Sequence, residues 1–218
     1  MKDIVKKNGL FLIFYVLIVA AALIPVFLYS RTDLHLLLNK FHTPWADVFF
    51  KFITFFGSGI AAAIVCIVLL FVRIRYTFII LASWAGSGII VQFLKHLVFP
   101  GYDRPVAVFA HNTALNLVYG LEYHHHFSFP SGHAATALAV FGFLALVTNR
   151  QWLKMVLLLC AVIVAYSRVY LSQHFLEDIL FGSALGILAL IIFYWYFNRL
   201  KMDWADHPVQ YYFRQEKK

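Results

Sequence analysis

A histidine and an aspartate in the second half of the sequence have a spacing that suits catalysis. His174 and Asp178 are four residues apart, so on a helix they would share one face. A carboxylate that accepts a hydrogen bond from one imidazole nitrogen leaves the other nitrogen with a free lone pair. An imidazole held in this way can act as a nucleophile or as a base. Taken alone, the same pair could instead cap the start of a helix at a membrane interface.

A second histidine follows a motif that is typical of a helix start. In the segment Pro130-Ser131-Gly132-His133, Ser131 suits the N-cap and Gly132 permits close approach of the backbone. The free N–H groups at a helix start bind phosphate well, and His133 would stand beside them as a proton donor. Without other features, the segment could equally be a plain cap.

Three cations complete the candidate site: Lys95, Arg104 and Arg168. An arginine binds phosphate oxygens through two parallel hydrogen bonds, whereas a lysine acts as a point charge. Lys95 alone could be a residue that extends from a helix end to the membrane surface. Three cations, two histidines, a serine and a carboxylate together favour a phosphate site over these separate explanations.

The composition indicates that lipid surrounds the elements that position these residues. The chain has 218 residues, of which 62% are hydrophobic and 13% charged, and a soluble domain of this size could not bury so much apolar surface. The length fits one domain over residues 1–218, with residues 95–178 as its motif core. The net charge of +8 is explained by cations near anionic headgroups, so no nucleic-acid partner is expected. Cys66 and Cys160 are expected to be free thiols.

We predict an all-α polytopic membrane protein with six transmembrane helices. An interfacial helix is expected within Arg31–Lys51, and a long outer loop connects the third and fourth spans between Phe99 and Pro130. The predicted spans are Phe11–Tyr29, Phe52–Val72, Tyr76–Leu94, Gly132–Thr148, Met155–Val169 and Ile179–Phe197.

Charge counting predicts the orientation. With both termini inside, twelve of the 18 Lys and Arg residues face the cytoplasm, including those of a tail at residues 199–218. The three candidate segments then fall on one face of the membrane, the outer one. A bacterial inner membrane, with the site facing the periplasm, is the expected location.

The three segments resemble the signature motifs of the type 2 phosphatidic acid phosphatase superfamily, which includes lipid phosphate phosphatases and vanadate-dependent haloperoxidases. The family pattern is Lys-x6-Arg-Pro, then Pro-Ser-Gly-His, then Ser-Arg-x5-His-x3-Asp. Residues 130–133 match the second motif and residues 167–178 match the third, residue for residue. In the first motif, residues 95–105, eight residues separate the lysine from the arginine instead of six.

The resemblance implies a mechanism and a role for each residue. His174 would attack phosphorus and form a phosphohistidine, Asp178 would hold its ring, and His133 would protonate the leaving group and later deprotonate water. Neither a metal nor another cofactor is implied. The residues implied to bind the phosphoryl oxygens are Lys95, Arg104, Ser131, Gly132 and Arg168.

The implied substrate is a lipid phosphate or diphosphate taken from the bilayer, with membrane lipids as the only other expected partners. Undecaprenyl diphosphate, phosphatidylglycerol phosphate, phosphatidic acid and the lipid A phosphates all fit the motifs. The loop Ala107–Phe129 is expected to select the head group. A lipid phosphotransferase would use the same phosphoenzyme and is the main alternative, and a transporter is a remote one.

Four smaller expectations concern residues around the motifs. Consecutive histidines at 124–126 favour a polar loop over a metal site, because neighbours in sequence do not easily ligate one ion. Glu177 is expected to face solvent, and Asp103 could orient the guanidinium of Arg104. Gly86 and Gly88 are expected to permit close helix packing.

Overall fold

The computed structural model describes residues 2–110 and 115–215, and every regular element in those ranges is helical. Residues 111–114 of the predicted head-group loop and 216–218 of the predicted tail lie outside the described residues. The α-helices are α1 Lys2–Leu28, α2 Arg31–Asn39, α3 Pro44–Ile53, α4 Gly59–Leu70, α5 Ile74–Phe93, α6 Pro105–Val108, α7 Gly132–Val147, α8 Gln151–Tyr170, α9 Leu176–Arg199 and α10 Val209–Gln215. Two 3₁₀ segments cover Thr54–Gly57 and Asp203–Asp206, and a π-helical turn covers Leu94–Val98.

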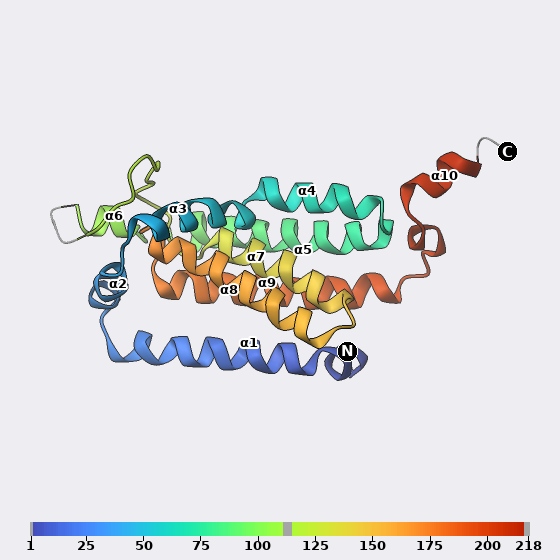
Figure 1. Ribbon diagram of the computed structural model, residues 1–218, viewed down its shortest axis with the longest axis horizontal. Coiled ribbons are helices and arrows are strands. Elements are labelled where there is room, and N and C mark those ends of the chain that lie inside the picture. Colours follow the sequence, from blue (N-terminus) through green and yellow to red (C-terminus); the bar gives the residue numbers. More distant parts are fainter. Residues whose placement is uncertain (1, 111–114, 216–218) are drawn as a thin grey trace.

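Helix α7 forms the centre of a bundle whose long helices run side by side (Figure 1). It packs against α5, α8 and α9, and most of its side chains are buried. Helix α1 lies along the outside of this bundle and leaves much of its apolar surface exposed, as expected of a helix in contact with lipid. The motif segment that precedes α7 is therefore anchored to the best-packed element of the fold.

Two glycines of α9 allow its backbone to cross α7 closely. A Cβ atom at Gly182 would overlap the carbonyl oxygen of Ser131, and one at Gly186 would overlap that of Ala135. Backbone cannot move aside as a flexible side chain can, so both positions require glycine. This crossing fixes the start of α7, with Ser131 and His133, against the start of α9, with Asp178.

We expect Gly186→Val to destabilise the protein strongly. Overpacking usually costs about 1–3 kcal/mol, and a backbone overlap belongs at or above the upper end of that range. Thermal unfolding in detergent measures the effect. Gly88→Val is the matched control, since a Cβ there meets nothing within 4 Å. Equal melting temperatures for the two variants would contradict the proposed helix crossing.

Four of the described helices are long and apolar enough to cross a membrane: Lys6–Leu28, Ile74–Val98, Gln151–Tyr170 and Leu176–Arg199. They match the predicted first, third, fifth and sixth spans. The prediction of one continuous helix over Phe52–Val72 is wrong. Residues 44–57 and 59–70 form two helical stretches bent by 54°, because Ser58 leaves the helical conformation and its side chain caps α4.

The predicted fourth span is a helix of almost the predicted limits, α7, but has only 16 residues. At about 1.5 Å per residue it is about 24 Å long, shorter than the bilayer core of about 30 Å. Its predicted cap is confirmed, since the Ser131 hydroxyl accepts a hydrogen bond from the Ala134 N–H. The count of six spans therefore stays a prediction.

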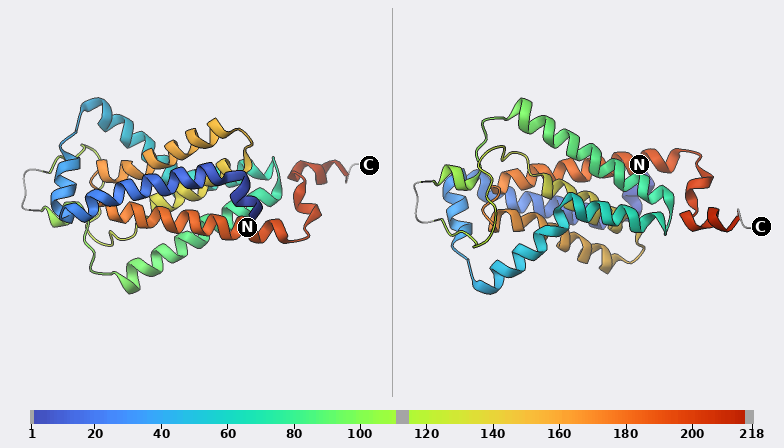
Figure 2. Two further views of the ribbon diagram at one scale, coloured as in Figure 1. Left: turned by 90° about the horizontal axis from the view of Figure 1, so that it is seen from below. Right: turned by 90° about the horizontal axis from the view of Figure 1, so that it is seen from above.

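The region predicted to hold one interfacial helix contains α2 and most of α3. Ser30 and Thr43 cap their starts, and Pro44 occupies the first turn of α3, where its missing N–H is harmless. Helix α3 and the last turns of α5 diverge from the bundle on opposite sides (Figure 2).

The three motif segments lie at one end of the bundle, and both chain termini lie at the other (Figure 1). This arrangement agrees with the prediction that the segments share one face. The C-terminal tail is attached to the bundle at the end where the termini lie. There the carboxylate of Asp206 pairs with Arg73 at 2.8 Å and with Arg75 at 2.5 Å. Which face of the membrane each end occupies stays a prediction.

Candidate active site

His174 and Asp178 form a buried pair at the start of α9. The Nδ1 atom of His174 lies 3.2 Å from Oδ2 of Asp178, and the two side chains are almost entirely shielded from solvent. This contact uses one ring nitrogen and leaves Nε2 to carry the lone pair. The pairing that the spacing predicts is therefore present.

His174 and Asp178 do not lie on one helix, which their four-residue spacing would have allowed, and α9 begins three residues before the predicted span Ile179–Phe197. His174 lies in the turn between α8 and α9, and Asp178 lies in the first turn of α9. The carbonyl of Arg168 accepts hydrogen bonds from the N–H groups of Gln173 and His174, which fixes the turn. Asp178 also accepts from the N–H of Phe175 at 3.0 Å, so it caps the helix as well as holding the imidazole.

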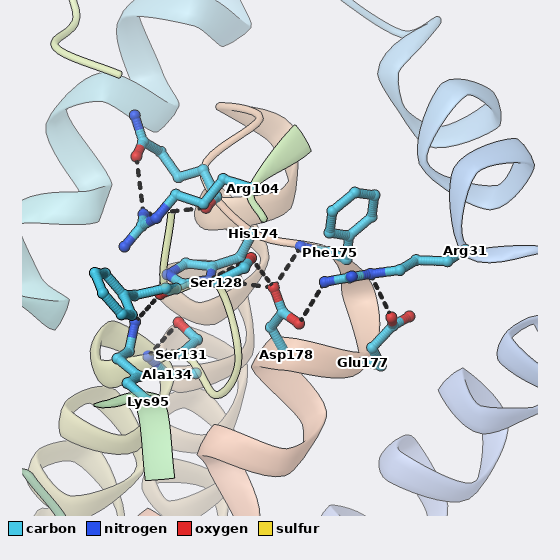
Figure 3. Close-up of polar contacts among 12 residues, drawn as sticks. Arg31, Lys95, Arg104, Ser128, Ser131, Ala134, His174, Phe175, Glu177 and Asp178 are labelled. Atoms are coloured by element: carbon cyan, nitrogen blue, oxygen red, sulfur yellow. Dashed lines mark hydrogen bonds and ion pairs between the residues drawn. The ribbon is translucent and has the colours of Figure 1, made fainter. Parts of the chain in front are cut away.

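Two residues that the motifs do not include complete the surroundings of Asp178. Ser128 donates a short hydrogen bond to Oδ2, and its hydroxyl lies 3.5 Å from the His174 ring nitrogen. Arg31 donates to Oδ1 at 3.2 Å. Figure 3 shows Arg31 and His174 on opposite sides of the carboxylate. Nothing in the sequence spacing indicated either residue, because both contacts join segments far apart in the chain.

Glu177 was predicted to face solvent, but its side chain is partly buried and forms an ion pair. Its carboxylate pairs with Nε of Arg31 at 2.6 Å, and the guanidinium carbon of Arg31 lies 3.8 Å from the centre of the Phe175 ring. Arg31 is therefore held by a carboxylate and an aromatic face in a position that also serves Asp178.

We expect Arg31→Gln to lower kcat by about tenfold with little change in KM. Loss of one charge-assisted hydrogen bond to a buried carboxylate costs about 1.5–3 kcal/mol. Part of this free energy is lost from the orientation of the imidazole, because the carboxylate holds the ring. Steady-state kinetics with a lipid phosphate, the substrate class that the motifs imply, measure kcat and KM separately. Partial recovery in Arg31→Lys would support a positioning role, whereas a large rise in KM alone would contradict it.

Burial keeps the His174 imidazole neutral. The pKa of His174 is lowered to about 3, mainly by desolvation and further by the charges of Arg104 and Lys95, while Asp178 opposes this shift. Burial contributes more to this lowered pKa than any neighbouring charge does. A neutral ring is the form that attacks phosphorus.

The lowered pKa gives a pH prediction. The His174 ring should stay unprotonated at pH 5, where an ordinary histidine with a pKa of about 6.5 is protonated. Because the unfolded chain regains the ordinary value, the folded state loses stability as the pH falls from about 6.5 towards 3. Nitrogen NMR of histidine-labelled protein, assigned by difference from His174→Gln, measures the protonation. A ring that titrates near 6.5 would contradict the prediction.

Three buried cations lie close to this pair. The Lys95 ammonium donates to the Phe127 carbonyl at 2.6 Å, and Arg104 donates to the backbone of His126 and to both oxygens of Gln173. Arg168 donates to the Thr54 hydroxyl at 2.8 Å. The two additional residues in the first motif therefore do not keep Lys95 away from the site.

These cations lack the carboxylates that normally accompany buried charge. Lys95, Arg104 and Arg168 are 6%, 8% and 9% exposed, and within residues 2–110 and 115–215 none of them forms an ion pair. The Nε atom of Arg168 is buried without any hydrogen-bond partner. Burying a charge costs free energy unless the charge is paired. A bound anion would pair these three cations, so the arrangement favours anion binding.

The start of α7 supplies the remaining predicted residues. Ser131 is fully buried, and its N–H donates to the Asp178 carbonyl, which ties the cap to α9. A Cβ at Gly132 would meet only Val91, at an ordinary 3.7 Å, so packing within the described protein does not require glycine there. His133 lies within electrostatic range of Arg168 and His174.

The smaller predictions have mixed outcomes. Asp103 pairs with His126 at 2.7 Å and does not orient Arg104. Gly86 packs closely on Phe193, whereas Gly88 has open space. Cys66 and Cys160 are free thiols. Across the described segments no cluster of three or more His, Cys, Asp or Glu has a metal-binding arrangement.

The sequence model of the PAP2 superfamily matches residues 76–202, more than half of the chain. The chain belongs to the PAP2 superfamily. This match confirms the family that the motifs indicated.

Three curated relatives of the superfamily are bacterial. The chain is 43% identical over 75 residues to phosphatidylglycerophosphatase B of Bacillus subtilis (strain 168), covering 30% of this chain and 37% of the relative. It is 32% identical over 84 residues to lipid A 4'-phosphatase of Bacteroides thetaiotaomicron, covering 38% and 37%. It is 32% identical over 120 residues to YbjG of Escherichia coli (strain K12), provisionally named an undecaprenyl-diphosphatase, covering 54% and 55%. The chain thus spans between about a third and just over half of these relatives.

Two solved structures share the fold. LpxE of Aquifex aeolicus aligns with a TM-score of 0.65 and 30% identity, over 74% of this chain and 93% of that one. A transmembrane PAP2-type phosphatidylglycerolphosphate phosphatase of Bacillus subtilis aligns with a TM-score of 0.65 and 20% identity, over 89% and 98%. Together with the long apolar helices, the second likeness supports a membrane protein.

Proposed function

We propose that this protein hydrolyses a lipid phosphate or diphosphate without a metal, through a phosphohistidine formed on His174. The observation that carries the proposal is the set of buried cations without carboxylate partners beside a neutral, oriented imidazole. The names of the relatives agree, since each acts on a phosphorylated lipid.

In the first step, Nε2 of His174 attacks phosphorus while the bond from phosphorus to the leaving oxygen breaks. His133 gives its proton to that oxygen, so that the lipid departs as an alcohol or as a lipid monophosphate. Asp178, held by Ser128 and Arg31, stabilises the positive charge that the attacking ring acquires.

In the second step, His133 removes a proton from water, whose oxygen attacks the phosphohistidine. The bond between nitrogen and phosphorus breaks, inorganic phosphate leaves, and His174 returns to its neutral form. In both steps the cations and the N–H groups at the start of α7 stabilise the charge on the phosphoryl oxygens. Phosphoryl transfer depends mainly on such positioning and charge stabilisation.

The direct test is phosphate release from a panel of lipid phosphates in detergent containing a chelator. We expect release that vanadate inhibits and that chelation leaves unchanged. Adding a second lipid with a free hydroxyl group distinguishes hydrolysis from phosphotransfer, because a transferase would label that lipid instead of releasing phosphate. Failure to act on any lipid phosphate would reject the proposal.

We further propose that both termini face the cytoplasm of a bacterial cell, so that the catalytic end of the bundle faces the periplasm. The excess of cations at the terminal end supports this orientation. A periplasm-dependent alkaline phosphatase fused after Lys218 should be inactive, and the same fusion within the loop at residues 115–120 should be active. The reverse pattern would reject the orientation.

A further inference from the structure

Two of the three site cations, Lys95 and Arg104, also line an open pocket of about 360 Å³. Its size falls in the range of small-molecule sites, about 300–1,000 Å³, and exceeds what one transferred phosphoryl group needs. Its lining residues come from the end of α5, the π-helical turn that follows it, Arg104 and the segment that leads into α7. It is lined by Gln92, Lys95, His96, Arg104, His124, His125, His126 and Phe127.

The lining of this pocket is entirely cationic or neutral. Lys95 and Arg104 contribute permanent charges, and four imidazoles surround them, at His96 and at residues 124–126. Among the described residues no carboxylate lines the pocket, and the nearby Asp103 is engaged by His126. Such a lining favours an anion, since imidazole donates one hydrogen bond when neutral and two when protonated.

The histidine segment is attached to the catalytic cations through its backbone. The carbonyls of His125 and His126 accept from the N–H and Nε of Arg104, at 2.8 and 3.0 Å, and the Phe127 carbonyl accepts from Lys95. The ring of Phe127 also contacts that of His96, with centroids 4.4 Å apart. Because backbone makes these attachments, the side chains of His124 and His125 remain available to bind a ligand next to the phosphate that Lys95 and Arg104 hold.

We propose that this pocket is a second anion site, which binds the phosphoryl group next to the one transferred and so favours lipid diphosphates over lipid monophosphates. The inference rests on the proposed function. His174 attacks the terminal phosphorus, the bond from that phosphorus to the bridging oxygen breaks, and the lipid monophosphate leaves with the electron pair and with a proton from His133. The pocket histidines hold the remaining phosphate throughout, and they stabilise the negative charge that builds up on the bridging oxygen.

The test compares farnesyl diphosphate with farnesyl monophosphate, which share one chain. In the variant that combines His96→Ala, His124→Ala and His125→Ala, we expect kcat/KM for the diphosphate to fall by tenfold or more. The value for the monophosphate should stay within about twofold. His126 is kept because it engages Asp103. His207→Ala is the matched control, since it removes an exposed imidazole outside this pocket, just before α10, and its diphosphate preference should be unchanged.

Each other result overturns the inference in a distinct way. Equal losses on both farnesyl substrates would show that the histidines support folding or the catalytic cations. A loss confined to phosphatidylglycerol phosphate, whose second phosphate is separated by glycerol, would assign the pocket to a remote phosphodiester. If the wild-type protein released phosphate from no lipid, the proposed function would fail and the inference with it. An active enzyme with an unaltered preference would reject the second site alone.

Discussion

Replacing His174 by glutamine is expected to reduce phosphate release from a lipid phosphate by about 10⁴-fold or more. A covalent mechanism cannot proceed without its nucleophile, and loss of such a group leaves only the contribution of binding and charge stabilisation. Glutamine keeps a polar group near Asp178, so that the buried carboxylate is not left without a partner. The measurement is single-turnover hydrolysis together with trapping of labelled enzyme by denaturation.

The wild-type enzyme should carry acid-labile label after a short exposure to labelled lipid, and the His174→Gln enzyme should carry none. His207→Gln is the matched control, because His207 is an exposed histidine just before α10, which lies at the opposite end of the bundle (Figure 1). Near-normal release by His174→Gln, with label on another residue, would assign the nucleophile elsewhere.

Replacing His133 by alanine is expected to slow lipid phosphate hydrolysis by about 10²–10⁴-fold, the usual contribution of general acid–base catalysis. The predicted defect depends on the leaving group. Nitrophenolate departs without a proton, so nitrophenyl phosphate should still phosphorylate His174 rapidly in this variant. Hydrolysis of the phosphoenzyme also needs His133, so that step should remain slow.

The expected signature is a burst of about one equivalent of nitrophenol, followed by slow turnover and accumulation of labelled enzyme. Gly57 makes close contact with the backbone of His133, so thermal unfolding must first show that the variant is folded. Equal losses with lipid phosphate and nitrophenyl phosphate, without a burst, would show that His133 positions substrate instead of transferring protons.

Both predictions depend on the neutral state of His174, and the structure explains how that state arises beside a carboxylate. Asp178 alone would raise the pKa of the ring, but burial and the neighbouring cations outweigh it. Arg31 and Ser128 share the charge of Asp178, which weakens its influence on the ring. The site thus keeps a carboxylate for orientation and a neutral nucleophile at the same time.

Sequence by itself determined the all-helical fold class of the described residues, the family and the local pairing of His174 with Asp178. Long apolar stretches specify helices wherever lipid is the solvent, because only helices or closed barrels satisfy the backbone there. Ser131 at a helix start and the spacing of His174 from Asp178 are local features, which the chain encodes within a few residues. The three short motifs specified the family, which the match over residues 76–202 confirmed.

Tertiary structure decided what depends on segments that are distant in the chain. The contacts of Arg31 and Ser128 with Asp178 span 147 and 50 residues, and no periodicity encodes such approaches. Burial of His174, and with it the lowered pKa, results from the packing of several elements at once. The break at Ser58 escaped prediction because its neighbours are as apolar as those of an unbroken helix, and hydropathy does not register backbone direction.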